Sequence, residues 1–228
     1  MKRTITLVTI LSVVLFFTSC NREESVNIDQ NRIYSTYEFI YDTETNVSHL
    51  NATFRLDNSS GQKLELSYPS RVDFNGEQLD WRKTSGYYRL NRTGNLNGGT
   101  FNFFDINGVV YSIASISLSS IDIPFGMNSI SKSGNFFLPW TGNPLQQGET
   151  IQVRISGSEN GGSQEFILTQ PGATHILLDQ YKLNNLTSGT ASIQIERSKS
   201  SSLTQSNLSG GRVNSTYRGR KVSILIVD

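Results

Sequence analysis

The sequence predicts an all-β protein with two β-sandwich domains in tandem. Short segments alternate apolar and polar residues, which is typical of strands that bury one face and solvate the other. Gly, Asn, Pro and Ser turn signals separate these segments at intervals of roughly 8–12 residues, as in sandwiches and barrels. No segment of useful length has helical periodicity. About eight strand segments precede residue 128 and about seven follow it, so we expect one sandwich on each side.

The composition supports this fold class. Hydrophobic residues make up 36% of the chain and charged residues 17%, against roughly 45–50% (glycine included) and 25% in typical domains. Ser, Thr, Asn and Gly make up the difference, which suits many turns. Aromatic residues at 10% argue against a disordered chain.

Residues 1–19 are predicted to be a cleaved signal peptide. Lys2 and Arg3 form a basic tip, and residues 5–17 form an apolar run. The run is too short to cross a bilayer, which takes about 20 apolar residues. A basic tip, a short apolar core and a small-residue end are typical of a secretory signal. An uncleaved anchor is the alternative, and the length argues against it.

The segment Phe17-Thr18-Ser19-Cys20 resembles the bacterial lipobox. In lipoproteins the cysteine of this motif becomes the first residue of the mature chain. Cys20 is the single cysteine of the sequence, and an odd cysteine in an exported protein needs an explanation. The resemblance implies diacylglycerol on the thiol and a further acyl chain, such as palmitate, on the amine. Two or more chains anchor a protein stably. A stray cysteine in a signal cleaved elsewhere is the alternative.

The residues after Cys20 favour an outer-membrane location. The residue after Cys20 is Asn21, whereas an Asp at this position favours inner-membrane retention in lipoproteins. Glu23-Glu24 resembles the acidic stretch of surface-exposed lipoproteins of Bacteroidota. The sequence does not decide between the periplasmic and the cell-surface face of the outer membrane. We expect residues 20–31 to be a lipidated polar tether that reaches about 35–40 Å at most. The first domain is therefore expected close to the membrane.

Residues 32–128 are predicted to form the first sandwich. Residues 32–41 and 47–56 alternate as strands, with Leu50, Ala52, Phe54 and Leu56 on one face. Residues 63–68 form a further strand that Pro69 ends. Residues 87–90 form a short strand after the first Asn-Gly turn.

Two hairpins are predicted around Asn75-Gly76 and Asn107-Gly108. In the first, a two-residue turn places Val72 opposite Leu79, Arg71 opposite Asp80 and Ser70 opposite Trp81. A three-residue turn would oppose the carboxylates of Asp73 and Glu77. Cross-strand pairs contribute roughly 0.2–1 kcal/mol each, so we favour the first register. The second hairpin has apolar residues on both faces and is expected to be covered on both sides.

Residues 129–228 are predicted to form the second sandwich, after a boundary region at 119–133. Strands are expected at 135–140, 149–156, 164–169 and 175–178. The pattern from Leu183 to Ile195 resembles the corner that leads into strand F of immunoglobulin-like domains. Residues 198–211 are expected to be a serine-rich loop. Residues 212–217 and 221–227 are expected to form a last hairpin around Arg218-Gly219-Arg220.

Three stretches resemble uncharacterised lipoproteins of Bacteroidota with tandem immunoglobulin-like domains. They are residues 72–79 with Tyr87-Tyr88, residues 103–111 and residues 137–151. The resemblance implies an envelope location and two immunoglobulin-like sandwiches. It implies no catalytic residues.

The sequence offers little for catalysis or metal binding. It holds two histidines, His49 and His175, and one cysteine, whereas a zinc site needs three or four ligands. The two Asp-x-Asn-Gly segments lack the further carboxylates of a calcium loop. No Gly-x-Ser-x-Gly or phosphate-binding glycine loop occurs. We therefore expect no cofactor, no metal and no enzyme, although a spatial pair of carboxylates stays open.

Aromatic side chains are the remaining indication of a ligand. Trp81, Tyr87, Tyr88 and Trp140 are able to stack on sugar rings, and core packing is the alternative. The alternative is favoured for both tryptophans. Tyr87 and Tyr88 are the candidate ligand-contacting residues.

We therefore expect a membrane-anchored envelope lipoprotein that acts as a non-catalytic binding or structural module for a glycan or protein ligand. Without Lys2 and Arg3 the chain has 18 basic against 19 acidic residues, which gives no basic field for nucleic acid. One alternative is a fimbrial or adhesin-like subunit in which Val222–Val227 pairs between chains. A glycan-active enzyme is the second alternative. The oligomeric state stays open.

Overall fold

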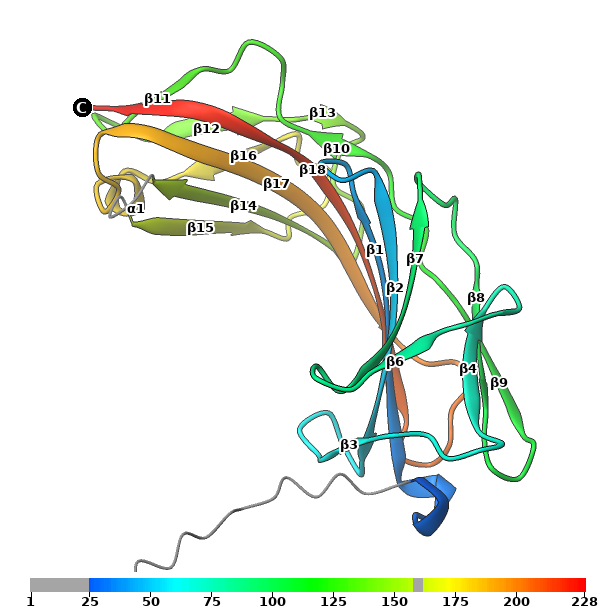
Figure 1. Ribbon diagram of the computed structural model, residues 1–228. Helices are drawn as coiled ribbons and strands as arrows, with labels where there is room; N and C mark the ends of the chain where they lie inside the picture. The colour runs from blue at the N-terminus through cyan, green and yellow to red at the C-terminus, as the bar shows by residue number, and fades with distance from the viewer. Residues whose placement is uncertain (1–24, 158–161) are drawn as a thin grey trace, which may run out of the picture.

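The structure is a computed structural model that describes residues 25–157 and 162–228 (Figure 1). Its described residues are mostly β-strand, with one short α-helix, α1 (Gln180–Leu183), and two 3-10 helices, η1 (Ser25–Asn27) and η2 (Gln30–Arg32). The predicted all-β class is thus confirmed. The predicted signal peptide and Cys20 lie outside the described residues. Within those residues, no helix is long and apolar enough to span a membrane.

A ten-stranded sheet runs through the whole molecule. Its strand order is β15-β14-β17-β18-β1-β2-β7-β6, with β11 also paired to β18 and β3 to β2. All neighbours are antiparallel except β1 and β11, which run parallel to β18. The strands are β1 (Ile33–Asp42), β2 (Val47–Leu56), β3 (Lys63–Leu64), β6 (Asp80–Arg82), β7 (Tyr87–Thr93), β11 (Ser129–Ser131), β14 (Glu149–Gly157), β15 (Ser163–Leu168), β17 (Gly189–Ser202) and β18 (Gly211–Val227).

Three smaller sheets lie on the outer side of the bend that the large sheet makes (Figure 1). The first has the order β5-β4-β8-β9, and the other two pair β10 with β13 and β12 with β16. The strands are β4 (Arg71–Phe74), β5 (Glu77–Gln78), β8 (Thr100–Phe104), β9 (Val110–Ala114), β10 (Ile121–Asp122), β12 (Phe136–Pro139), β13 (Thr141–Gly142) and β16 (His175–Leu178). Within residues 25–157 and 162–228, these sheets cover only the outer side of the large sheet, and its other face has no such cover.

Two hydrophobic clusters fill the space between the layers. We call the cluster around Leu50, Phe54 and Phe101 the first core, and the cluster around Val153, Ile155 and Ile193 the second core. The predicted alternation is confirmed for Leu50, Ala52 and Phe54 and for Ile151, Val153 and Ile155, which are buried. Asn51 departs from it because it is also buried, and Leu56 is only partly buried. The division of the chain at residue 128 stays a prediction. Val213, however, packs in the first core although it is close to the end of the chain.

The last part of the chain differs from the prediction. Residues 198–202, expected to belong to a loop, continue β17, and residues 211–227 form one strand instead of a hairpin around Arg218-Gly219-Arg220. The serines lie on a paired strand, where Ser200 Oγ donates to Asn214 Oδ1 at 2.7 Å. A Cβ at Gly219 would lie 2.8 Å from the carbonyl oxygen of Ile121. The glycine therefore serves close packing rather than a turn.

The end of β18 is paired on both sides within the chain. Ile224 lies opposite Ala191 of β17, and Ile226 lies beside Ile130 of β11. The sequence analysis favoured this placement of residues 222–227 over pairing between chains. The fimbrial or adhesin-like alternative itself stays a prediction.

Part of the expected tether is folded. Residues 25–32 form η1 and η2, and Ser25 is fully buried. The backbone N–H of Ser25 donates to the Glu65 carbonyl at 3.0 Å, and Asn207 Nδ2 donates to the Gln30 carbonyl at 2.6 Å. The sequence predicts a tether here because the partners of this polar segment, residues 65–67 and 207–209, lie far away in the sequence.

The first hairpin has the favoured register, with Phe74 opposite Glu77 and Asp73 opposite Gln78. Beyond Leu79 the chain crosses to the other layer. Trp81 therefore pairs with Tyr88 of β7 rather than with Ser70. Asp80 likewise lies opposite Arg89 and not opposite Arg71. The Asn-Gly turn signal correctly predicted the hairpin. The hairpin has only two paired residues on each side, because the chain then leaves β4 and joins β7 of the large sheet.

Candidate binding face

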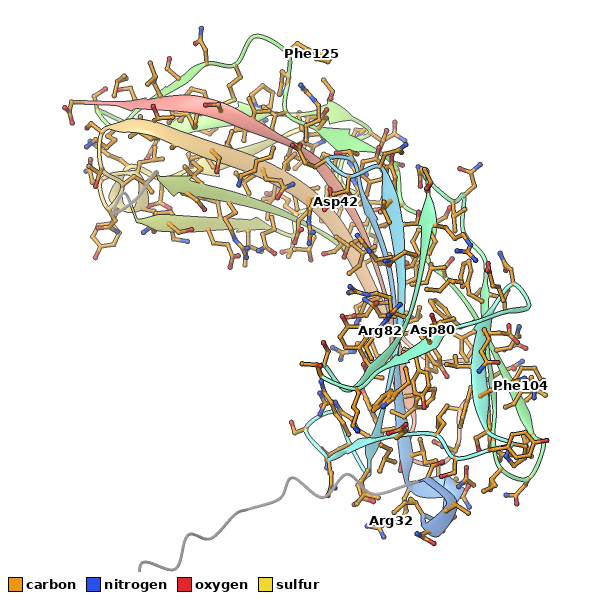
Figure 2. The ribbon with its side chains drawn as sticks, in the orientation of Figure 1. Arg32, Asp42, Asp80, Arg82, Phe104 and Phe125 are labelled. Carbon is orange, nitrogen blue, oxygen red and sulfur yellow. The ribbon has the colours of Figure 1, made fainter. Side chains whose placement is uncertain are left out.

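The uncovered face of the large sheet lies on the inner side of the bend and is polar. We call it the inner face. It is formed by the side chains of the large sheet that point away from both cores. Figure 2 shows Asp42 and Arg82 on this side, whereas Phe104 and Phe125 lie on the outer side. Successive residues of a strand point to opposite faces, so the same strands supply both the cores and the inner face.

Arg218 organises the centre of the inner face. Its Nη1 contacts Asp42 Oδ2 of β1 at 3.2 Å, and its Nε contacts Glu196 Oε2 of β17 at 3.1 Å. Partial burial alone would lower the pKa of Arg218, but the hydrogen bonds and charges of Glu196 and Asp42 outweigh it and raise that pKa. Three neighbouring strands are therefore joined by one guanidinium.

A hollow lies beside Arg218 on the same face, with a volume of about 230 Å³. Its lining consists of planar hydrogen-bonding groups and holds no hydrophobic side chain. The lining residues are Gln152, Arg154, Gln194, Glu196 and Arg218. Arg154 Nη2 contacts Glu165 Oε1 of the edge strand at 3.0 Å, so the hydrogen-bonded network reaches the edge of the sheet.

A second network crosses β1, β2 and β7. Asn51 Nδ2 donates to Glu38 Oε2 at 3.2 Å, and Arg89 Nε donates to Asn51 Oδ1 at 2.9 Å. The Arg89 guanidinium lies 4.9 Å from the ring centre of Tyr87. Each side chain is held by its neighbour on the next strand. Such groups present their remaining donors and acceptors in fixed directions.

A shallow, open groove of about 570 Å³ ends the inner face at β6 and β7. Tyr87 is half-buried in it and stands among cationic and polar groups. The other lining residues are Trp81, Arg82, Lys83, Thr84, Ser85, Arg89 and Asn91. This groove combines an aromatic ring with several hydrogen-bond donors.

The two tyrosines predicted to contact a ligand, Tyr87 and Tyr88, point to opposite faces of β7. Tyr87 lies on the inner face, whereas Tyr88 is only 6% exposed and packs in the first core. The Tyr88 hydroxyl accepts from the Leu66 N–H at 2.7 Å, and burial raises the pKa of Tyr88 to about 12. Of the two, Tyr87 is the one that lines the groove.

The two tryptophans pack against the cores, and Trp81, which is partly buried, also contributes to the lining of the groove. Trp81 packs against Tyr88 with ring centres 4.8 Å apart. Trp140 is buried in the second core, and its Nε1 donates to the Asn143 carbonyl at 3.1 Å. This agrees with the core-packing interpretation that the sequence favoured for both.

The histidines do not come together at a common site. His49 Nδ1 lies 2.9 Å from Asn91 Oδ1 on the inner face, and His175 packs edge-on against Phe137 on β12. Among the residues that the structure describes, no group of three or more His, Cys, Asp or Glu side chains is placed to hold a metal ion.

Sequence reasoning missed Asp42, Glu196 and Arg218. They come from three strands whose pairing joins residue 42 to residue 218. Each occupies a polar position in an alternating strand, which is the one signal that the sequence held. The carboxylates of Asp42 and Glu196 both bind the guanidinium of Arg218, so each is held in an ion pair.

The chain matches no protein-family model, and no curated protein is similar to it at a significant level.

Proposed function

We propose that this chain is a lipid-anchored protein of a bacterial cell envelope that binds a glycan on its inner face without turning it over. In this proposal Cys20 carries the lipid, the outer membrane is the location, and the two cores belong to tandem immunoglobulin-like domains of a Bacteroidota-type lipoprotein. The lipobox-like segment and the single cysteine support the anchor. The inner face supports the binding role.

The observation that carries the proposal is the chemistry of the inner face. Sugars present many hydroxyl groups and weakly apolar CH faces, and aromatic rings with planar polar groups suit both. The hollow at Arg218 offers amide, carboxylate and guanidinium groups, and the groove at Tyr87 offers an aromatic ring beside Arg89. Most ligand pockets are apolar clefts, and neither of these regions has that character.

The networks also support binding without catalysis. Asp42 and Glu196 are hydrogen-bonded to the same guanidinium and serve to position it. Fixed side chains lose little freedom when a ligand binds, which favours affinity. A protein ligand remains the main competitor, and the experiment distinguishes it.

The test is binding of the full chain, extracted from membranes in mild detergent, to a panel of soluble polysaccharides. We expect Tyr87→Ala to weaken binding to the selected glycan about tenfold, the loss of roughly one stacking contact of about 1.4 kcal/mol. Arg218→Gln is expected to weaken it at least as much. Tyr181→Ala is the matched control, because Tyr181 is 82% exposed on α1.

The outcomes separate the candidate functions. Equal losses for Tyr87→Ala and Tyr181→Ala would place the ligand elsewhere. Release of reducing ends from a bound polysaccharide would make the protein an enzyme. Capture of a protein with no retention of any polysaccharide would replace the glycan by a protein ligand.

A further inference from the structure

One end of the molecule gathers exposed hydrophobic side chains around the first described residues. Tyr68 is 94% exposed, Leu208 88% and Val26 48%, and Val109 and Val110 are exposed to similar degrees as Val26. They come from four separate segments of the chain. Exposed side chains of this size that gather at one place often mark an interaction surface.

Hydrogen bonds place two of these segments against η1 and η2. Ser67 N–H, next to Tyr68, donates to Ser25 Oγ at 2.9 Å, beside Val26. Ser209 N–H, next to Leu208, donates to the Asn31 carbonyl at 2.9 Å. Residues 25–31 are therefore the common support of Val26, Tyr68 and Leu208.

Strand register brings the β8–β9 turn to the same end. Arg71, which follows Tyr68 closely, lies opposite Phe104, and Phe104 lies opposite Val110. Ser112 N–H of β9 donates to Gln205 Oε1 of the segment that carries Leu208, at 3.0 Å. Figure 1 shows the β8–β9 turn, the β17–β18 connection and η1 at the same end of the molecule. We call this end, with Val26, Tyr68, Val109, Val110 and Leu208, the apolar end.

The chain length between Cys20 and Ser25 decides what covers the apolar end. Five Cα-to-Cα steps join the two residues and span at most about 18 Å. Ser25 itself is buried and cannot move away from the first core without breaking its hydrogen bonds. A lipid on Cys20 therefore holds Ser25 within that distance of the lipid attachment point, and brings the apolar end around it to the headgroup layer of the bilayer.

We propose that the apolar end rests in the surface of the membrane that holds the lipid of Cys20, with the bilayer as its occupant. The side chains suit this position, because Tyr is enriched at membrane interfaces and aliphatic side chains gain by leaving water there. The inference rests on the anchor of the proposed function. It adds an orientation: β1 rises from the membrane, and the second core lies at the far end of the bend.

The test uses the full, membrane-purified protein in phosphatidylcholine vesicles that contain a lipid-linked quencher. Cys20 is the single cysteine, so a cysteine introduced elsewhere is the one free thiol of the acylated chain and takes a fluorescent label. Leu208→Cys and Val110→Cys report on the apolar end. Phe125→Cys is the matched control, because Phe125 is 86% exposed and lies on the outer side of the second core, away from η1 (Figure 2).

We expect quenching of the label at 208 and at 110 to exceed that at 125 at least threefold. Equal quenching at the three positions would overturn the inference. A label at 208 that is shielded from solvent but not quenched would also overturn it, because this result indicates a protein partner. Mass spectrometry of the N-terminal peptide is read separately. An acylated Cys20 with no quenching at 208 contradicts the orientation alone, and a Cys20 without lipid contradicts the proposed anchor and the orientation together.

Discussion

The buried ion pair between Arg197 and Glu149 gives the sharpest prediction on stability. Arg197 follows Ile193 and Ile195 on the inward side of β17 and is fully buried, and Glu149 of β14 is 5% exposed. Arg197 Nη1 contacts Glu149 Oε2 at 3.1 Å, and the same oxygen accepts from the Gln146 N–H at 2.9 Å. Burial lowers the pKa of Arg197, and Glu149 opposes that shift. The guanidinium therefore depends on this one carboxylate.

The perturbation is Glu149→Ala. It leaves a buried guanidinium without its counter-ion, and breaking a buried pair in this way costs about 3–5 kcal/mol. The Gln146 N–H also loses its acceptor, but Gln146 is an exposed residue and we add nothing for it. For a chain of this size the loss corresponds to a fall in Tm of roughly 6–20 °C. Replacing both partners, Arg197→Met with Glu149→Leu, removes the charge along with its partner and is expected to cost about 1 kcal/mol or less.

Urea unfolding followed by tryptophan fluorescence measures both variants. The background carries Trp81→Phe, so that Trp140 of the second core is the one reporter; its Nε1 donates to the Asn143 carbonyl, which also accepts from Arg197. Single and double variants form a cycle that isolates the coupling between the pair. A loss below about 1 kcal/mol for Glu149→Ala would refute the reasoning, since it would mean that Arg197 reaches water or another anion when Glu149 is gone.

Two further predictions test the first core and the parallel strand pair. Burial raises the pKa of Tyr88 to about 12, above its ordinary value of 10.0, so the side chain is neutral in the folded chain below pH 12; its contribution to stability is complete below pH 10 and is lost as pH rises through 12. Circular dichroism against pH should show that Tyr88→Phe is about 1 kcal/mol less stable at pH 7, where the Leu66 N–H lacks its acceptor, yet loses less stability between pH 10 and 12 than the parent chain. Gly211→Ala places a Cβ 2.2 Å from the Ser35 carbonyl oxygen and should lower the free energy of unfolding by about 2 kcal/mol, measured in urea. Gly134→Ala, whose Cβ meets open space, is its control, and an equal effect of both would contradict the close packing of β1 on β18.

Local patterns predicted the strands well. The alternation in residues 47–56 and 149–156 correctly identified most of the buried side chains, because burial of one face imposes a period of two on the strand itself. The Asn-Gly signal at residues 75–76 correctly predicted a two-residue turn, since both residues have positive φ there as that turn type requires. Information of this kind lies within about ten residues of sequence.

The partners of the strands were beyond the reach of the sequence. Residues 198–202 read as a serine-rich loop because nothing near them shows that residues 212–216 lie opposite. Residues 25–31 read as a tether for the same reason. Arg197 shows the limit most clearly: a charged residue in an alternating strand suggests the solvated face, yet it occupies the buried one, since Glu149 neutralises it from a strand 48 positions earlier.

The sharing of strands has a consequence for the inner face. β17 and β18 run from one core to the other, and β18 pairs with β1 over residues 35–42 while its other end pairs with β11. Rotation of one core against the other would have to break backbone hydrogen bonds along two continuous strands. The hollow at Arg218 and the groove at Tyr87 are thus held on one sheet at a fixed separation. A polymer long enough to contact both would bind to positions that are set before it arrives, which lowers the entropic cost of binding. An oligosaccharide too short to reach both sites should therefore bind more weakly than the polymer. The difference in binding free energy should exceed the contribution of the contacts at the site that it does not reach.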